Sequence, residues 1–327
     1  MRRTTRHFLM LVILGLFISG CSPDAPHSNP FDPMSPNYSP TGVLTGKVLS
    51  LSAPYIGISR VLVTIEQTGD AQYTSSDGSF SFSTAPTGNV TIVATKPSYL
   101  ADTLNVNLQV GKTYNEEIHI DALPQVSSAE VITSKIDQWW PGPVYSALVT
   151  ASAIDPDGIA DLDSIYVRVD SLTFPMNYSI TDKNFQATID AAELPNQDLQ
   201  WLIGRELVVS AVDKAGGVGQ SAGFYVSRII EPEANPTYPA SLDTTTGTPT
   251  FDWNPPSVSY NYTYQLQVVS LAGGTQTVVW SVSGLSSSDV SYSYPGVLPS
   301  GSYFWTAAVV DDFGNSSRSK EASFVVP

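Results

Sequence analysis

The stretch Leu207–Gly217, LVVSAVDKAGG, has a near counterpart in Trp305–Asn315, WTAAVVDDFGN. In each copy, apolar residues alternate along a run that ends in Asp, and Gly follows three positions later. Alternation with a period of two indicates a half-buried β-strand, and Asp and Gly favour a tight turn. The pattern therefore predicts one hairpin in each of two related β-modules, with turns that begin at Asp213 and Asp311.

Similar alternation recurs along the chain and favours an all-β fold. It is found in Arg60–Glu66, Ile165–Asp170 and Tyr262–Val268, each of which fits a strand with one buried face. From residue 42 onward almost no segment has helical periodicity. The exception is Asp198–Gly204, which fits a single helical turn stopped by glycine. Many short strands at regular spacing predict tandem β-sandwiches.

A chain of 327 residues has room for two or three domains, and three β-sandwich modules are expected, at residues 42–122, 125–231 and 232–327. In the first module, Ser75–Phe82 reads SSDGSFSF. Asp77–Gly78 predicts a tight hairpin turn there, because both residues tolerate the left-handed backbone. Phe80 and Phe82 would then point the same way into the core.

The first module resembles the carboxypeptidase regulatory-like domain, a transthyretin-like sandwich. Besides Ser75–Phe82, the resemblance rests on Thr45–Val48, Pro86–Gly88 and Tyr99, and it covers the whole module. Ser98 stands where that family usually has glycine. In metallocarboxypeptidases the domain accompanies a zinc catalytic domain. This sequence has no such catalytic domain, so the resemblance implies the fold and not the peptidase activity.

The third module resembles a fibronectin type III-like domain, through Phe251–Pro256 and Gly301–Trp305. Trp253 and Trp305 are expected in the core between the two sheets, where large aromatic side chains usually pack. The second module is similar to immunoglobulin-like domains in a more general way.

Residues 1–20 have the order of a secretory signal peptide, with three arginines, an apolar run and two small residues. Ile18–Cys21 resembles the lipobox of bacterial lipoproteins, which implies cleavage before Cys21 and lipid attached to it. Several acyl chains on one residue give lasting membrane attachment. Ser22 implies the outer membrane under the sorting rule of many Gram-negative bacteria. The alternative is an unlipidated signal peptide in which the single cysteine is incidental.

Residues 21–41 contain six prolines and almost nothing that could form a core, which predicts an extended tether. At about 3.1 Å per residue, a proline-rich chain of this length reaches roughly 65 Å. The alternative is that NPFDP, Asn29–Pro33, docks on a partner.

The sequence is strongly acidic, with 15 basic and 30 acidic residues. Loss of residues 1–20 removes three arginines and no acid, which leaves 12 basic against 30 acidic residues and a net charge of −18. Such a surface repels phosphate backbones, so nucleic acid is not an expected partner.

Gly219–Gly223, GQSAG, matches the nucleophile motif G-x-S-x-G around Ser221, but that motif needs a strand-to-helix turn and a histidine base. Here it follows a hairpin, and only His119 of the three histidines lies in a module. A zinc site lacks ligands for the same reason. Paired carboxylates for glycoside cleavage stay open, since acids are numerous and no pair stands out. No catalytic residue is predicted, and the chain is expected not to be an enzyme.

The stretch DPDGIADLDS carries four aspartates within nine residues: Asp155, Asp157, Asp161 and Asp163. Oxygen ligands on a flexible loop suit Ca²⁺, although glycine at the fourth place differs from an EF-hand. The alternative is an ordinary Pro-Asp-Gly turn with solvated acids. A structural Ca²⁺ is therefore a candidate, and no other cofactor is expected.

Trp139 and Trp140 are adjacent and precede a proline. On a strand they would face opposite sides, so one core cannot take both. If exposed, they could stack on sugar rings or anchor a protein partner. The alternative is that one covers the end of the sandwich and the other rests on a neighbouring module.

These features together predict an exported, lipid-anchored surface lipoprotein without catalysis, whose modules act in binding, adhesion or spacing. The alternative is a carbohydrate-binding component of a polysaccharide-handling system, and a hydrolase is a distant third. The expected partners are the membrane, through Cys21, and a glycan or a surface protein.

Overall fold

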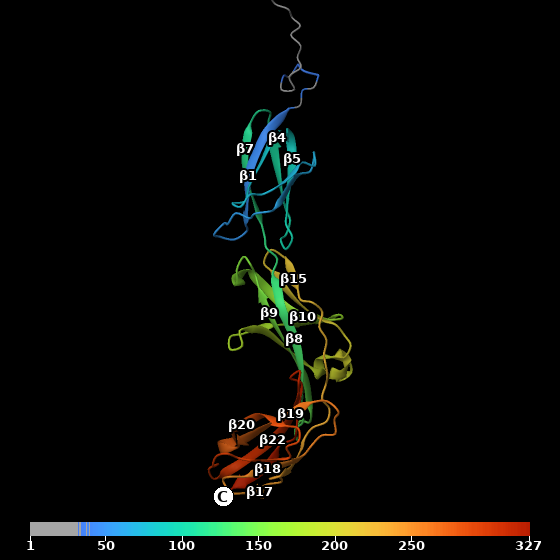
Figure 1. Ribbon diagram of the computed structural model, residues 1–327, viewed down its shortest axis with the longest axis vertical. Coiled ribbons are helices and arrows are strands. Elements are labelled where there is room, and N and C mark those ends of the chain that lie inside the picture. The colour runs from blue at the N-terminus through green and yellow to red at the C-terminus, as the bar shows by residue number, and fades with distance from the viewer. Residues whose placement is uncertain (1–31, 33, 37, 39) are drawn as a thin grey trace, which may run out of the picture. The chain divides into compact units, whose positions relative to one another are not determined.

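The computed structural model describes residues 32, 34–36, 38 and 40–327 (Figure 1). These residues form 24 strands and five short 3₁₀ helices, the longest of which is η4 (Leu199–Leu202). No helix in this part of the chain is long and apolar enough to cross a membrane. The fold is all-β, which confirms the prediction from alternation. The described residues divide into two compact units, unit 1 up to residue 121 and unit 2 from residue 122 to residue 327.

Unit 1 is a sandwich of two sheets, with strand orders β4-β1-β7 and β3-β2-β5-β6. Its first and last strands, β1 and β7, pair in parallel. The strands are β1 (Thr41–Ser50), β2 (Leu62–Ile65), β3 (Ala71–Tyr73), β4 (Ser79–Pro86), β5 (Gly88–Thr95), β6 (Asp102–Leu108) and β7 (Thr113–Ile120).

Phe80 is buried in the core of unit 1 and Phe82 packs against that core, as predicted. Gly78 has a φ of +83°, the left-handed conformation that the turn prediction required. The prediction that this turn closes a hairpin is wrong, because β3 and β4 on its two sides belong to different sheets. Asp77 instead accepts hydrogen bonds from Ser79 and holds a turn that crosses between the sheets.

Unit 2 has two cores. The first core packs between the sheets β12-β13-β9-β8 and β11-β10-β14-β15. The strands are β8 (Gln125–Ile136), β9 (Val144–Ile154), β10 (Leu162–Val169), β11 (Leu172–Pro175), β12 (Asn177–Ser179), β13 (Asn184–Asp190), β14 (Leu207–Asp213) and β15 (Val218–Gln220). Short 3₁₀ turns connect some of them: η1 (Ile159–Asp161), η2 (Ala191–Glu193), η3 (Pro195–Gln197) and η4.

Local sequence explains the η4 turn. The Asp198 side chain accepts a hydrogen bond from the backbone of Gln200 at its start, and Gly204, with a φ of +75°, follows its end. This confirms the single helical turn predicted at Asp198–Gly204.

The second core of unit 2 packs between β23-β22-β19-β20, extended by β24 and β17, and the facing sheet β16-β18-β21. Trp253 and Trp305 are 2% and 0% exposed, so both lie in the core as predicted. The elements are β16 (Asn235–Tyr238), β17 (Asp243–Thr244), β18 (Thr250–Asn254), β19 (Tyr262–Ser270), η5 (Ala272–Gly274), β20 (Thr277–Ser286), β21 (Ser291–Ser293), β22 (Gly301–Asp311), β23 (Ser316–Arg318) and β24 (Ala322–Val326).

One ten-stranded sheet runs through both cores of unit 2. Strand β8 pairs with β9 along its length, and its carboxyl end pairs in parallel with β23. In that parallel pairing Ser134, Lys135 and Ile136 lie opposite Ser316, Ser317 and Arg318. Backbone pairing therefore joins the two C-terminal sandwiches of the chain.

Candidate functional site

The two related turns have the same backbone geometry. The backbone N–H of Asp213 donates to the carbonyl of Gly217 at 3.0 Å, and that of Asp311 donates to Asn315 at 3.0 Å. Oδ1 of Asp213 accepts from the backbone of Gly217 at 2.7 Å, and Oδ1 of Asp311 accepts from Asn315 at 2.9 Å. Both turns begin where the sequence predicted. They differ in what the second carboxylate oxygen meets.

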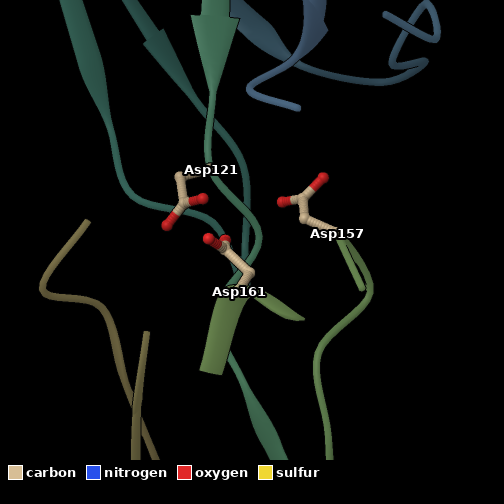
Figure 2. Close-up of side chains that lie close together, drawn as sticks. All are labelled: Asp121, Asp157 and Asp161. Carbon is tan, nitrogen blue, oxygen red and sulfur yellow. The ribbon is translucent and has the colours of Figure 1, made fainter. Parts of the chain in front are cut away.

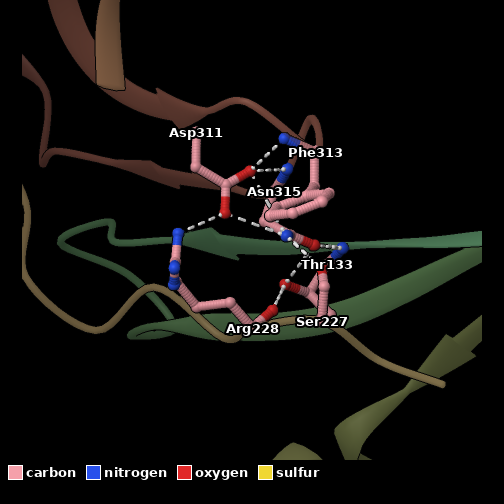
Figure 3. Close-up of polar contacts among 6 residues, drawn as sticks. All are labelled: Thr133, Ser227, Arg228, Asp311, Phe313 and Asn315. Atoms are coloured by element: carbon pink, nitrogen blue, oxygen red, sulfur yellow. Dashed lines mark hydrogen bonds and ion pairs between the residues drawn. The ribbon is translucent and has the colours of Figure 1, made fainter. Parts of the chain in front are cut away.

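In the third module, the carboxylate of Asp311 is paired on both oxygens. Its Oδ2 accepts from the guanidinium of Arg228 at 2.9 Å and from the side-chain amide of Asn315 at 3.1 Å (Figure 3). Asn315 is fully buried, and its Oδ1 accepts from the backbone of Thr133 at 2.9 Å. Its Nδ2 also donates to Ser227 at 2.9 Å. The turn of the third module is therefore bonded to β8 of the second.

In the second module, the corresponding carboxylate lies beside the acidic loop. Leu162 of β10 is opposite Asp213 of β14, and the backbone of Lys214 donates to the carbonyl of Asp161 at 3.0 Å. Oδ2 of Asp213 is buried and has no hydrogen-bond partner. Pairing of β10 with β14 thus brings a fourth acid to the loop that the sequence singled out.

The acidic loop is shaped by its own hydrogen bonds. Oδ1 of Asp155 accepts from the backbone of Asp157 at 2.8 Å, and Oδ2 of Asp157 accepts from the backbone of Ala122 at 2.8 Å. Asp157 and Asp161 each have a carboxylate oxygen within 4.8 Å of the other's (Figure 2). Asp121, also drawn there, is the last residue of unit 1.

Asp155 and Asp213 are buried, Asp157 and Asp161 are partly buried, and none of the four has a basic partner among the described residues. Oδ2 of Asp155 and Oδ2 of Asp161, like Oδ2 of Asp213, are buried and accept no hydrogen bond. Burial and the like charges of Asp161, Asp157 and Asp213 raise the pKa of Asp155. Among the described residues, no lysine, arginine or histidine forms an ion pair with any of these four carboxylates. Asp163, by contrast, is exposed on β10 and lines a separate groove.

Trp139 and Trp140 lie in the loop after β8 and are 71% and 86% exposed. Nε1 of Trp139 donates to the carbonyl of Glu321 at 2.9 Å, and Nζ of Lys320 lies 4.7 Å from its ring centroid. Trp139 therefore rests on the third module with most of its surface in solvent. Neither indole is among the residues that pack against the two cores of unit 2.

A groove of about 460 Å³ adjoins Trp139. Its lining includes Glu233, Asn235, Lys320 and Glu321, so it combines carboxylates, an amide and an ammonium group with one indole. Burial and the neighbouring Asp137 raise the pKa of Glu233. The groove offers hydrogen-bonding groups beside an exposed aromatic face.

Ser221 has the same structural contact as Ser319 in the related turn. Its Oγ accepts from the backbone of Val209 at 3.0 Å, as Oγ of Ser319 accepts from Ala307 at 3.0 Å. Strand β15 leads directly into Ser221, so the G-x-S-x-G motif lies on a hairpin rather than at a strand-to-helix turn. His119 belongs to unit 1.

The lipidation site predicted at Cys21 lies outside the described residues, together with the signal peptide and most of the tether. Their structure is therefore not part of the candidate site.

No protein-family model matches the chain, and no curated protein matches it. Solved structures resemble it at low identity. The chicken CNTN1 FN1–FN3 domains match with 9% identity and a TM-score of 0.34, covering 88% of this chain and 99% of that one. The Clostridium thermocellum CbhA fibronectin(III)-like modules match with 13% identity and a TM-score of 0.29, covering 62% and 93%. Domains from titin match with 11% identity and a TM-score of 0.22, covering 84% and 91%. These likenesses concern the fold alone.

Proposed function

We propose that the chain is a non-catalytic envelope lipoprotein, in which lipid on Cys21 anchors a stiff pair of β-sandwiches used for spacing or for presenting a binding surface. One observation carries the proposal: the buried, hydrogen-bonded junction between the two cores of unit 2. Neighbouring domains of one chain usually move relative to each other unless their interface is large and well packed. A spacer needs the opposite behaviour.

The buried network opposes bending at the junction. Asn315 and Thr133 are 0% and 2% exposed, and the bonds of Asn315 connect Thr133 of β8 to the β22–β23 turn. Opening the junction would exchange these hydrogen bonds for bonds to water, at a net cost of about 0.5–1.5 kcal/mol each. Parallel pairing of β8 with β23 adds backbone bonds that the same opening would break.

The segment that connects the two cores is also held on both sides. Nζ of Lys135 donates to the carbonyl of Glu231 at 2.7 Å, and the hydroxyl of Tyr145 donates to its carboxylate at 2.8 Å. Arg228, earlier in the segment, lies 3.9 Å from the ring centroid of Tyr260 in the third module. The connection therefore does not behave as a free linker.

Stiffness is tested by distance measurements between the two modules. Cys21 is the only cysteine, so the chain from Ser22 to Pro327 accepts spin labels at two introduced thiols without interference. Tyr178→Cys on β12 and Val279→Cys on β20 give exposed positions in the second and third modules. A narrow distance distribution is expected, which Asn315→Ala should broaden and the exposed control Asn261→Ala should not. A broad distribution in the unmodified background would contradict the spacer proposal.

The anchor is tested separately in cells. Cys21→Ala should abolish incorporation of a labelled fatty acid and release the protein from the membrane fraction. Label uptake by the variant would show that Cys21 does not carry the lipid.

A second candidate function, glycan binding, is favoured by the exposure of Trp139 and Trp140 beside a polar groove. Flat aromatic faces stack on sugar rings, and hydrogen-bonding groups at the rim would orient the ring. Glycan-array binding by the chain from Ser22 onward is expected under this candidate. The variant Trp139→Ala/Trp140→Ala should lose about 2 kcal/mol of binding, roughly thirtyfold, with little change in stability. Tyr225→Ala, another exposed aromatic, is the control. Absence of binding to any glycan on the array would contradict this candidate and leave the spacer as the remaining proposal.

A further inference from the structure

The acidic cluster of the second module is short of positive charge. It is made of Asp155, Asp157, Asp161 and Asp213, and the described residues supply no ion pair to any of them. Lys214, which directly follows Asp213, donates its ammonium group to the carbonyl of Ala160 instead. Four carboxylates in a partly buried site repel one another unless a cation offsets their charge.

Two of these side chains are almost fully buried. Asp213 is 2% exposed and Asp155 is 7% exposed, and Oδ2 of each accepts no hydrogen bond. In both residues the other oxygen, Oδ1, is already bonded to a backbone N–H within its own turn. The turn bonds therefore explain one oxygen of each carboxylate and leave the second buried without a hydrogen-bond partner. A buried carboxylate oxygen without a partner is costly, so each such oxygen calls for a ligand.

The related turn shows what normally meets the second oxygen. Asp311 is equally buried, and its Oδ2 is met by the guanidinium of Arg228. In the second module no guanidinium or ammonium group of the described residues pairs with Asp213. The loop joined to its turn through Lys214 and Asp161 adds negative charge instead of positive. The same turn thus requires a cation from another source.

We propose that the second module binds one Ca²⁺ through the carboxylates of Asp155, Asp157, Asp161 and Asp213. Ca²⁺ takes six to eight oxygen ligands, in irregular geometry and partly from the backbone, which suits a loop joined to a strand end. Zn²⁺ prefers histidine and cysteine, and neither residue is present in the set. Mg²⁺ requires near-ideal octahedral geometry and keeps most of its water, which suits buried carboxylates less well. The proposal is independent of the proposed function.

Calorimetric titration with Ca²⁺ tests the site directly. The chain from Ser22 to Pro327, which retains every described residue, is first freed of metal by chelation, and its metal content is checked by mass spectrometry. One Ca²⁺ per chain is expected to bind, with a rise in melting temperature and at least tenfold weaker binding of Mg²⁺. If the chelated protein is unfolded, refolding on addition of Ca²⁺ is the equivalent result. Absence of binding heat together with equal melting in Ca²⁺ and in chelator would overturn the proposal.

Two matched substitutions locate the ion. Asp213→Asn keeps the shape of the side chain and its ability to accept from Gly217, but removes one charge, and should weaken Ca²⁺ binding at least tenfold. Asp163→Asn, in the same stretch but exposed, should leave the affinity within twofold. If Asp213→Asn does not fold, Asp157→Asn replaces it, because Asp157 is less buried. Equal affinities in all variants, or a larger effect of Asp163→Asn, would place the ion elsewhere and refute the assignment.

Discussion

The turns at Asp213 and Asp311 have nearly the same backbone and opposite electrostatic surroundings. In both, one carboxylate oxygen closes the turn through a backbone N–H. At Asp311 the other oxygen meets Arg228, whereas at Asp213 it lies by a loop with three further acids and has no hydrogen-bond partner. The difference shows that a repeated strand-and-turn pattern preserves backbone geometry, while the role of the turn depends on the segment packed against it.

The largest effect is expected from removal of the guanidinium. Arg228→Met leaves the Asp311 side chain, which is 0% exposed, without its cation. Loss of one partner from a buried ion pair costs about 3–5 kcal/mol of unfolding free energy. Denaturant unfolding measures this loss, and Arg168→Met, at an exposed position on β10, should change stability by about 0.5 kcal/mol or less. A change equally small for Arg228→Met would show that Asp311 does not need its cation.

The partners of these two aspartates could not be predicted from local sequence. Arg228 lies 83 positions before Asp311, and no spacing rule connects them. The sequence predicts Asp213 as the start of a turn, but its place beside Asp161 follows only from the pairing of β10 with β14. The repeat itself is the one sequence feature that points to these partners. Because Asp213 and Asp311 occupy equivalent positions, a cation beside one carboxylate suggests a cation beside the other.

Structural features that depend on residues close together in the sequence are predicted well. Alternation located the strands around Ile165 and Tyr264, whose side chains are buried. Prediction from local sequence is less successful where the result depends on which sheet a strand joins. Asp77–Gly78 has the backbone of a tight turn, yet hydrogen bonding of the flanking strands to other partners makes it a crossing between sheets. Spacing alone groups Asp163 with the acidic loop, whereas its position on β10 exposes its side chain.

The second largest loss of stability is expected from Asn315→Gly, which makes the turn of the third module like the turn of the second module. Asn315 occupies the position of Gly217, so Asn315→Gly deletes the side chain that bonds Thr133 and Ser227. The buried N–H of Thr133 then lacks its partner, and the bonds to Asp311 are reduced. Together these losses should cost about 2–4 kcal/mol. Hydrogen exchange should show faster exchange at Thr133, while a stability change below about 0.5 kcal/mol would mean that water replaces the amide.

Calcium should distinguish the two turns. At a Ca²⁺ concentration of 100 times Kd, binding to the folded state alone adds about 2.7 kcal/mol of stability. Asp213→Asn should lose most of this gain, and Asp311→Asn should keep it, although the latter is less stable in both buffers. Melting curves of both variants, each in Ca²⁺ and in chelator, give the four melting temperatures that are compared. Equal loss of the calcium response in both variants would mean that the ion does not distinguish the turns.

The smallest expected effect concerns the serines that follow the two turns. Ser221 and Ser319 each accept a backbone N–H at 3.0 Å from the preceding strand, from Val209 and Ala307. Removal of such an acceptor costs about 1 kcal/mol, so Ser221→Ala and Ser319→Ala should lower the unfolding free energy by similar amounts. A nucleophile would behave differently: Ser221 alone would react with a fluorophosphonate probe, and its replacement would abolish that labelling. We expect no labelling of either serine and matched losses of stability, because the two hydroxyl groups occupy equivalent places in equivalent turns. Labelling confined to Ser221 would separate the turns chemically and reopen a hydrolytic role for the second module.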